Sequence, residues 1–302
     1  MKSKSKAVYL SFDTLKPDFG KIIIIDLNTL KSVTLIDNNF YNSNPLFFDK
    51  DRKILFASAR IGNPYQLRVT SYHAWRQLYQ IDCDSLTIQP YFKSDEAPNS
   101  NEINKFIGLS RDFKRKQVYF VNDDNKMYKI QDYTTKPILL TTFDKDFLIF
   151  DLRISLDEKY IAVWYNNMKN LITGIYVYDI SSNKVIDDIR SSKKSVKLVG
   201  WTIDNNLIYQ DDSLFVMNLN SNVRKLFDIN LDSKKHNIKN IYAENQDSYI
   251  LLVDKLVYNE NAKYNITNSS EIARYNCKLK IIEWLTNDGH IKKELNIFST
   301  FE

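Results

Sequence analysis

Short apolar runs separated by polar turns recur along the whole sequence, as expected for β-strands joined by tight connections. Several segments share one layout, in which an apolar stretch leads into a polar turn with an aspartate and then into a strand rich in β-branched and aromatic residues. The copies are Phe47–Phe56, Leu109–Phe120, Ile154–Val163, Gly200–Tyr209 and the weaker Tyr242–Leu252. Their turn aspartates, which are 61, 45, 47 and 43 residues apart, are Asp51, Asp112, Asp157, Asp204 and Asp247. The chain is therefore built from a repeated unit.

A second pattern follows these strands, namely an apolar strand with an acidic or amide side chain at or near its end. Its copies are Leu78–Asp82, Met127–Gln131, Ile175–Asp179 and Leu214–Asn218, with outer copies at Ile22–Asp26 and Leu279–Trp284. Repeats of about 40–45 residues are typical of four-stranded propeller blades. The six copies predict an all-β fold, a six-bladed β-propeller of four-stranded antiparallel blades.

The two repeated patterns extend along the whole chain, and no composition shift marks a linker. We therefore assign residues 1–302 to a single propeller domain. We expect the blades at approximately 7–37, 40–95, 101–143, 147–190, 195–228 and 237–298. The first of these ranges holds only three predicted strands, Val8–Phe12, Ile22–Leu27 and Val33–Ile36. Closed propellers often complete such a blade with the opposite end of the chain, so we expect Ile297–Phe301 to supply the missing strand.

The composition supports a sheet protein with unusual turns. Tyr and Phe number 19 and 17, and aromatic side chains fit the pleated, half-buried surface of a sheet. The chain has only 6 glycines and 6 prolines, well below the usual shares of about 7% and 5%. We therefore expect Asn, Asp and Ser to form the turns, because their side chains bond to nearby backbone and tolerate left-handed conformations.

Charge, cysteine content and hydropathy limit the partners and the compartment. The net charge of +5 is mild, and basic runs such as Arg111–Lys116 do not merge into one stripe, which argues against a nucleic-acid surface. The two cysteines, Cys83 and Cys277, form no CxxC motif and no disulfide framework. No signal-peptide core follows the basic start, and no apolar run reaches the ~20 residues of a membrane span. We expect a cytoplasmic protein, or a periplasmic or secreted one if an upstream signal has been removed.

The turn segments Phe48–Phe56, Leu109–Phe120 and Ile154–Val163 resemble the Ser-Pro-Asp-Gly-Lys turns of TolB-like propellers, which are relatives of the Trp-Asp (WD) repeat propellers. The resemblance extends over nearly the whole chain. The sequence departs from the pattern in that Gly is replaced and Pro is missing in these turns, and no Trp-Asp dipeptide occurs. The resemblance implies the same blade architecture as the repeat.

Motifs for catalysis and for metal binding are absent from the sequence. His73, His236 and His290 have no second ligand at a zinc-like spacing, and there is no Gly-x-Ser-x-Gly elbow or Gly-rich phosphate loop. We therefore expect no catalytic residue, no metal and no cofactor. The alternative is a carbohydrate-active enzyme or a small-ligand-binding propeller that uses the central channel. The candidate carboxylates for this alternative are Asp82, Asp146, Asp151 and Asp179.

Two long insertions carry side chains that are typical of protein interfaces. We expect Ser58–Gln77 and Asp254–Cys277 to form long loops that join the second and third strands of their blades, on one face. Tyr, Trp and Arg are enriched at interface hot spots. The candidate partner-binding residues are Arg60, Arg68, Tyr72, His73, Trp75, Arg76, Tyr258, Tyr264, Arg274 and Tyr275. The sequence thus predicts a non-enzymatic module that binds another protein, for example an inhibitor or immunity-type protein that occludes its partner. The competing interpretation is that these rings only pack their own loops.

Overall fold

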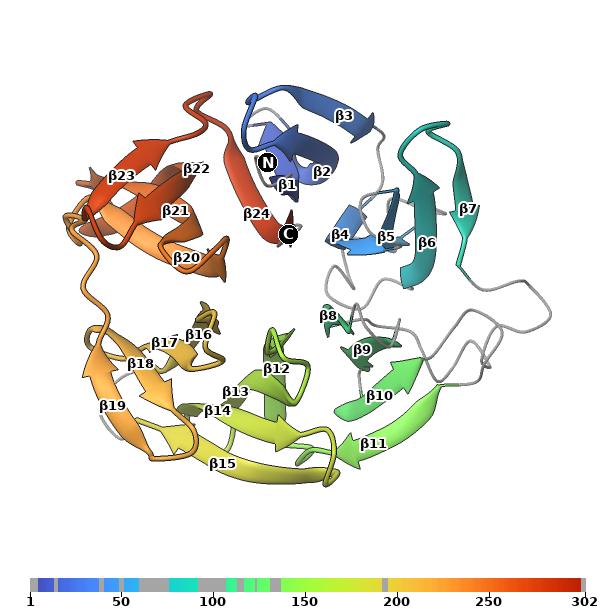
Figure 1. Cartoon of the computed structure of the whole chain (residues 1–302), viewed down its shortest axis with the longest axis vertical. Coiled ribbons are helices and arrows are strands. Elements are labelled where there is room, and N and C mark those ends of the chain that lie inside the picture. Colours follow the sequence, from blue (N-terminus) through green and yellow to red (C-terminus); the bar gives the residue numbers. More distant parts are fainter. Residues whose placement is uncertain are drawn as a thin grey trace. The chain divides into compact units, whose positions relative to one another are not determined.

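The computed structural model describes residues 5–13, 16–37, 41–48, 52–59, 76–91, 107–112, 117–122, 124–130, 137–191 and 195–299. Figure 1 labels the elements of these residues, all of which are β-strands, so the prediction of an all-β chain is confirmed for the part described. Among the same residues, no helix is long and apolar enough to cross a membrane. The chain forms two compact units. Unit 1 comprises Met1–Asn38, Val199–Ile208 and Leu214–Glu302, and unit 2 comprises Asn39–Leu198 and Tyr209–Ser213.

Asx turns without glycine connect many neighbouring strands. After β2 (Lys16–Asp26), the Asp26 carboxylate accepts hydrogen bonds from the backbone N–H groups of Asn28 at 2.9 Å and Thr29 at 2.8 Å. The backbone then passes through the left-handed region at Leu30 (φ 59°), whose N–H donates to the Asp26 carbonyl oxygen. Other side chains that accept turn N–H groups are Asp82, Asp179, Asn218, Asn259 and Asn276. The prediction that Asn and Asp form the turns is confirmed for these connections.

In the repeated aspartate turn, the aspartate and the first residue of the turn both accept backbone N–H groups. The Asp157 carboxylate accepts the Lys159 N–H at 3.2 Å, but the turn is closed by the Ser155 hydroxyl oxygen, which accepts the Tyr160 N–H at 3.0 Å. In a second copy of this turn the acceptor is Thr202 Oγ1, which takes the N–H of residue 206 at 3.0 Å. In both copies the side chain of the first residue therefore accepts an N–H group from the far side of the turn.

One sheet of unit 1 contains the first and the last strand of the described chain, in the order β24-β1-β2-β3. Its strands are β1 (Ser5–Asp13), β2, β3 (Ser32–Ile36) and β24 (Ile291–Ser299). β24 pairs antiparallel with β1, from Ser5 opposite Ser299 to Phe12 opposite Ile291 (Figure 1). The predicted closing strand is thereby confirmed for Ile297–Ser299. Thr300 and Phe301 lie outside the described residues.

The second sheet, most of whose residues belong to unit 1, has eight strands in the order β19-β18-β17-β16-β20-β21-β22-β23. Its strands are β16 (Lys197–Trp201), β17 (Leu207–Gln210), β18 (Leu214–Asn218), β19 (Val223–Leu226), β20 (His236–Ala243), β21 (Ser248–Asn259), β22 (Tyr264–Asn276) and β23 (Ile281–Trp284). Parallel pairing of Gly200 with Ile241 joins two groups of four strands. A Cβ atom at position 200 would collide with the Ile241 carbonyl oxygen, so this close approach requires glycine.

Apolar side chains from both sheets form the core of unit 1. One cluster brings Tyr9 from β1 and Leu295 from β24 together with Leu252 and Ile272 from the eight-stranded sheet. The cluster therefore packs β1 and β24 against β21 and β22, and this packing positions the site described below.

Unit 2 contains three four-stranded sheets, in the orders β4-β5-β6-β7, β11-β10-β9-β8 and β12-β13-β14-β15. Its strands are β4 (Tyr41–Phe48), β5 (Lys53–Ala59), β6 (Arg76–Asp82), β7 (Ile88–Pro90), β8 (Ile107–Asp112), β9 (Gln117–Val121), β10 (Lys126–Ile130), β11 (Ile138–Thr142), β12 (Phe147–Ile154), β13 (Tyr160–Asn167), β14 (Ile172–Asp179) and β15 (Lys184–Arg190). Aromatic stacking is prominent in its core: the Tyr165 ring lies 4.4 Å from Phe147 and 4.7 Å from Tyr176, measured between centroids.

Candidate functional site

The β21–β22 hairpin extends beyond its neighbours in the eight-stranded sheet. β20 pairs with β21 only as far as Lys255, and β23 pairs with β22 only from Ala273 to Asn276. The pairing between β21 and β22 continues to Asn259 opposite Tyr264. The expectation of a long loop at Asp254–Cys277 was wrong, because most of this segment is paired strand.

One face of the hairpin is apolar and exposed. Side chains alternate along a strand, so Lys255, Val257 and Asn259 of β21 share a face, and Ile266 and Tyr264 of β22, which lie opposite the last two, share it as well. The side chains of Val257, Ile266 and Tyr264 are 50%, 39% and 62% exposed. We define the hairpin face as Lys255, Val257, Tyr264 and Ile266, together with His236 and Trp284.

His236, Lys255 and Trp284 form a cluster at the base of the hairpin face. His236 lies opposite Lys255 on the neighbouring strand, and its ring centroid is 5.6 Å from that of Trp284. The Lys255 ammonium lies 5.1 Å from the Trp284 ring centroid, which is a cation–π distance. The cluster thus combines an aromatic surface with a positive charge. The sequence pattern does not reveal this cluster, because the three residues come together only through the pairing of strands.

The turn before β20 supports one edge of the hairpin. The Leu256 N–H donates to the Lys235 carbonyl oxygen at 2.7 Å, and Asn265 Nδ2 donates to the Lys234 carbonyl oxygen at 3.2 Å. Tyr258 lies opposite Asn265 and is exposed, on the face opposite to the hairpin face. Of the predicted pair of tyrosines, Tyr264 therefore belongs to the hairpin face and Tyr258 does not.

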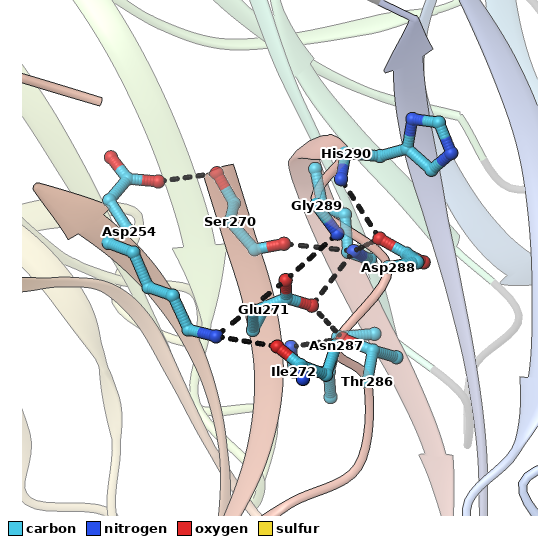
Figure 2. Close-up of polar contacts among 11 residues, drawn as sticks. Asp254, Ser270, Glu271, Ile272, Thr286, Asn287, Asp288, Gly289 and His290 are labelled. Carbon is cyan, nitrogen blue, oxygen red and sulfur yellow. Dashed lines mark hydrogen bonds and ion pairs between the residues drawn. The ribbon is translucent and has the colours of Figure 1, made fainter. Parts of the chain in front are cut away.

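A buried polar network anchors the hairpin below its exposed end (Figure 2). Glu271 of β22 is 0% exposed, and its carboxylate accepts hydrogen bonds from the Thr286 hydroxyl at 2.6 Å and the Lys292 ammonium at 3.2 Å. Lys292, which belongs to β24, also donates to the Ser270 carbonyl oxygen at 2.9 Å and to the Asp288 carboxylate at 2.5 Å. The network ties the hairpin to β24 and to the loop that precedes it.

A second buried carboxylate, that of Asp254, joins the two strands of the hairpin. It accepts hydrogen bonds from the Ser270 hydroxyl at 2.6 Å and the Thr267 hydroxyl at 3.1 Å, and it forms an ion pair with Lys239 at 3.0 Å. These contacts cross from β21 to β22 and to β20. They hold the base of the hairpin in a fixed register.

The acidic and basic side chains of the network are equal in number, and its central lysine, Lys292, is saturated in hydrogen bonds. The acids are Asp254, Glu271 and Asp288, and the lysines are Lys239, Lys255 and Lys292. The Lys292 ammonium has three donors, and all three have acceptors. Burial raises the pKa of Asp288, but the hydrogen bonds from Lys292 and the His290 N–H, together with the charge of Lys292, hold this pKa below its usual value. The Lys292 ammonium therefore has no donor left for a substrate, and we assign the Glu271–Lys292 pair a role as an anchor.

Arg274 and Tyr275, which the sequence analysis proposed for partner binding, make structural contacts. The Arg274 guanidinium forms a bidentate pair with Glu244, at 2.8 and 2.9 Å, and also donates to the Leu27 carbonyl oxygen at 3.0 Å. The Tyr275 ring is buried, and its hydroxyl donates to the Asp228 carbonyl oxygen at 2.8 Å. Both side chains hold unit 1 together, so we leave them out of the binding surface.

The other predicted residues belong to the first insertion. This insertion joins β5 to β6, the second and third strands of their sheet, as expected. Arg76 is the first residue of β6. The remaining residues lie outside the described part of the chain and stay predictions: Arg60, Arg68, Tyr72, His73 and Trp75.

The carboxylates suggested for carbohydrate chemistry have local roles where the structure shows their contacts. Asp82 and Asp179 are turn acceptors, and Asp151 accepts hydrogen bonds from the Arg153 guanidinium at 2.9 and 3.0 Å. Within the described ranges, no group of three or more potential metal ligands occurs. Cys83 and Cys277 are free thiols.

Comparisons with known proteins bear on the fold. No family model and no curated protein matches the sequence. Among solved structures, TolB from Acinetobacter baumannii has a TM-score of 0.62 at 13% identity, over 97% of this chain and 66% of that one. A putative TolB from Agrobacterium tumefaciens has a TM-score of 0.60 at 10% identity, over 100% of both chains. Hydrazine synthase from Kuenenia stuttgartiensis has a TM-score of 0.61 at 13% identity, over 99% of this chain and 47% of that one.

These likenesses concern the fold alone, because the identities are low. They agree with the sheets described above and with the resemblance carried by the turn segments. This chain has the β-propeller fold of TolB-like proteins.

Proposed function

We propose that this chain is a six-bladed propeller that serves as a non-enzymatic protein-binding module, with the hairpin face as its contact surface. The blade count treats the eight-stranded sheet as two blades, because the parallel pairing of Gly200 with Ile241 links two groups of four strands. With the four-stranded sheets, these groups make six blades.

The observation that carries the proposal is an exposed apolar surface on a rigidly anchored hairpin. Val257, Tyr264 and Ile266 are exposed where the hairpin extends past its neighbours. Their burial against a partner would contribute roughly 25 cal/mol per Å² of apolar surface removed from water. The buried Glu271–Lys292 pair holds the hairpin in place, so little conformational entropy is lost on binding.

In its more specific form, the proposal describes an inhibitor or immunity-type protein. A rigid hairpin that extends from a sheet can enter a cleft, so it can occlude the active site of a partner. We propose the cytoplasm as the compartment, since free thiols such as Cys83 and Cys277 persist where the environment is reducing.

The test is capture of a partner from native cell extract on the immobilised chain, with identification by mass spectrometry and reconstitution from purified proteins. The variant Tyr264→Ser with Ile266→Ser should lose the stoichiometric partner. The matched control is Leu279→Ser, which removes a side chain that is 67% exposed in the turn after β22, outside the hairpin face. A partner that binds the double variant and the control equally well would overturn the assignment of this surface.

A second candidate function, binding of a carbohydrate or another small ligand, is favoured by an aromatic pair in unit 2. Phe150 of β12 is exposed, and its ring centroid lies 4.6 Å from that of Trp164. Trp164 Nε1 donates to the Val196 carbonyl oxygen at 2.6 Å, which fixes the indole. Ring faces of this kind pack against the apolar faces of ligands in binding sites. Titration of oligosaccharides with tryptophan fluorescence tests the idea, and a signal that survives in Trp164→Phe would exclude this pair.

A further inference from the structure

We propose that the hairpin face recognises an extended acidic segment of the partner, which places a carboxylate on Lys255 and an apolar side chain on the Val257–Ile266 pair. This inference rests on the protein-binding function proposed above, and it adds the chemistry of the segment that is bound.

The Lys255 ammonium retains donor capacity for a ligand. It has three N–H donors, and the Asn287 side-chain oxygen accepts one of them at 2.8 Å. Glu271 lies 4.0 Å away, beyond hydrogen-bond distance, and its carboxylate is already bonded to Lys292 and Thr286. The Lys255 side chain is 33% exposed. A partner carboxylate can therefore reach this ammonium without displacing an acceptor of the chain itself.

Trp284 and His236 strengthen the site. The Trp284 ring lies next to the Lys255 ammonium and excludes water from part of its surroundings. Charge-assisted hydrogen bonds are stronger where water is excluded. His236 Nδ1 lies 3.3 Å from the Asp232 carbonyl oxygen, a contact that orients the imidazole beside the indole. The cluster thus presents the positive charge of Lys255 beside two aromatic rings, and a carboxylate can bind to this charge.

The charges around the hairpin face also favour an acidic partner. In the turn at 232–235 and the exposed part of the hairpin at 255–267, the lysines are Lys234, Lys235, Lys255 and Lys263, and the acids are Asp232 and Glu260. The other two acids of the hairpin, Asp254 and Glu271, are buried and paired with Lys239 and Lys292. Asp232 lies 3.9 Å from Lys235 and offsets that charge in part. The remaining surplus is positive. Such a surplus speeds encounter with an acidic surface and is screened by salt.

Strand geometry sets the spacing that the partner must match. Lys255 and Val257 are two residues apart on β21, which corresponds to about 7 Å along the strand. An extended partner segment also directs every second side chain to the same side. A carboxylate at one position and an apolar side chain two positions away therefore fit Lys255 and Val257. A further apolar side chain, two more positions along, would reach Tyr264.

The test uses a phage-displayed library of short random peptides, selected on the purified full chain with the Tyr264→Ser, Ile266→Ser variant as counter-selection. We expect enrichment of peptides with Asp or Glu two positions from an apolar residue. Binding of a selected peptide should fall at least tenfold in Lys255→Gln and be retained in Lys255→Arg. Lys278→Gln is the matched control, since this lysine is 71% exposed and pairs with Asp247 away from the hairpin face.

The outcomes separate the inference from the function on which it rests. Peptides that bind the hairpin face but carry no acidic residue, or that bind Lys255→Gln as tightly as the unmodified chain, would overturn the inference and leave the binding function standing. A selection that enriches nothing above the counter-selected variant would overturn both.

Discussion

At the scale of single residues, the turns explain how the chain manages with so few glycines. Leu30, Leu86 and Leu171 have φ angles of 59°, 56° and 58°, a region that costs an L-residue roughly 1–2 kcal/mol. In each turn, the N–H of the leucine donates to the carbonyl oxygen four residues earlier. The hydrogen bonds of the turn thus offset a local strain that glycine would not carry.

This strain predicts an unusual gain from a glycine substitution. Leu171→Gly should raise the free energy of unfolding by about 0.5–1 kcal/mol, because the strain is relieved and the side chain is 76% exposed, so little burial is lost. Leu156→Gly is the control, since Leu156 is also an exposed turn leucine but has no positive φ; it should lose about 0.5–1 kcal/mol. Urea denaturation compares the two, and equal losses would show that the strain is absent.

The Asx turns also predict how stability depends on pH. The backbone and hydroxyl hydrogen bonds of Ser85 hold the pKa of Asp82 below its usual value, and those of Ser181 and Ser182 do the same for Asp179. For Asp26, burial raises the pKa, but the N–H groups of Thr29 and Asn28 outweigh it. A lowered folded pKa means that this stabilisation is complete above the unfolded value of about 3.9 and is lost as the pH falls through the folded pKa.

The measurement is the free energy of unfolding as a function of pH, from neutral to acid. The triple variant Asp26→Asn, Asp82→Asn and Asp179→Asn keeps the acceptors and removes the titration, as the native Asn218 and Asn276 turns do. As the pH falls into the acid range, the free energy of unfolding of this variant should decrease less steeply than that of the unmodified chain. If the two curves of unfolding free energy against pH coincide in the acid range, these carboxylates do not contribute to the pH dependence of stability.

At the scale of elements, the buried network decides whether the hairpin is rigid. Lys292→Met leaves Glu271 and Asp288 without their shared cation, and loss of one member of a buried pair typically costs about 3–5 kcal/mol. The double variant Lys292→Met, Glu271→Met should lose less than the sum of the two single variants, because it leaves no unpaired charge at this pair. Thermal and urea unfolding measure all three.

The control for this series is Lys278→Met, which breaks an ion pair of similar length, 2.8 Å, on the surface. It should have little effect, since exposed pairs are screened by water and salt. If the double variant loses as much free energy of unfolding as the two single variants together, the charges at positions 271 and 292 do not act as a pair.

At the scale of the whole molecule, local patterns predicted the strands and the turns better than the surfaces. The apolar strand Ile175–Asp179 and its Asx turn depend on neighbouring residues, so a single sequence displays them. The hairpin was missed because the polar residues of 259–268 are typical of loops, whereas the pairing of Val257 with Ile266 is a contact across the turn. The burial of Lys292 beside the exposed Lys293 depends on packing between distant strands, which the Lys-Lys-Glu run does not reveal.

β24 completes the first sheet of unit 1, and we expect the stability of this sheet to depend on it. A chain that ends before Ile291 leaves the edge of β1 unpaired along Ser5–Phe12 and removes Leu295 from the core. It also leaves Glu271 without the ammonium of Lys292. We expect this chain to lose β-sheet circular dichroism in part and to aggregate, because an open apolar edge pairs with other chains. A synthetic peptide that spans β24 should restore the signal, since it supplies the same backbone and core contacts.

The two adjacent lysines of β24 make this experiment selective. A peptide with Lys292→Met should restore the fold only at much higher concentration, because its side chain enters the buried network without a charge to meet Glu271 and Asp288. A peptide with Lys293→Met should act almost like the unmodified one, since Lys293 is exposed and its contact with the Phe12 ring, at 4.8 Å, is a weak cation–π interaction at the surface. Equal potency of the two variant peptides would mean that backbone pairing alone holds β24. A truncated chain that keeps its full signal without any peptide would mean that the strand is dispensable. We expect the Lys293→Met peptide to act at nearly the same concentration as the unmodified peptide, and the Lys292→Met peptide only at a much higher one. This order follows only if the buried charge pair selects the strand that completes the sheet.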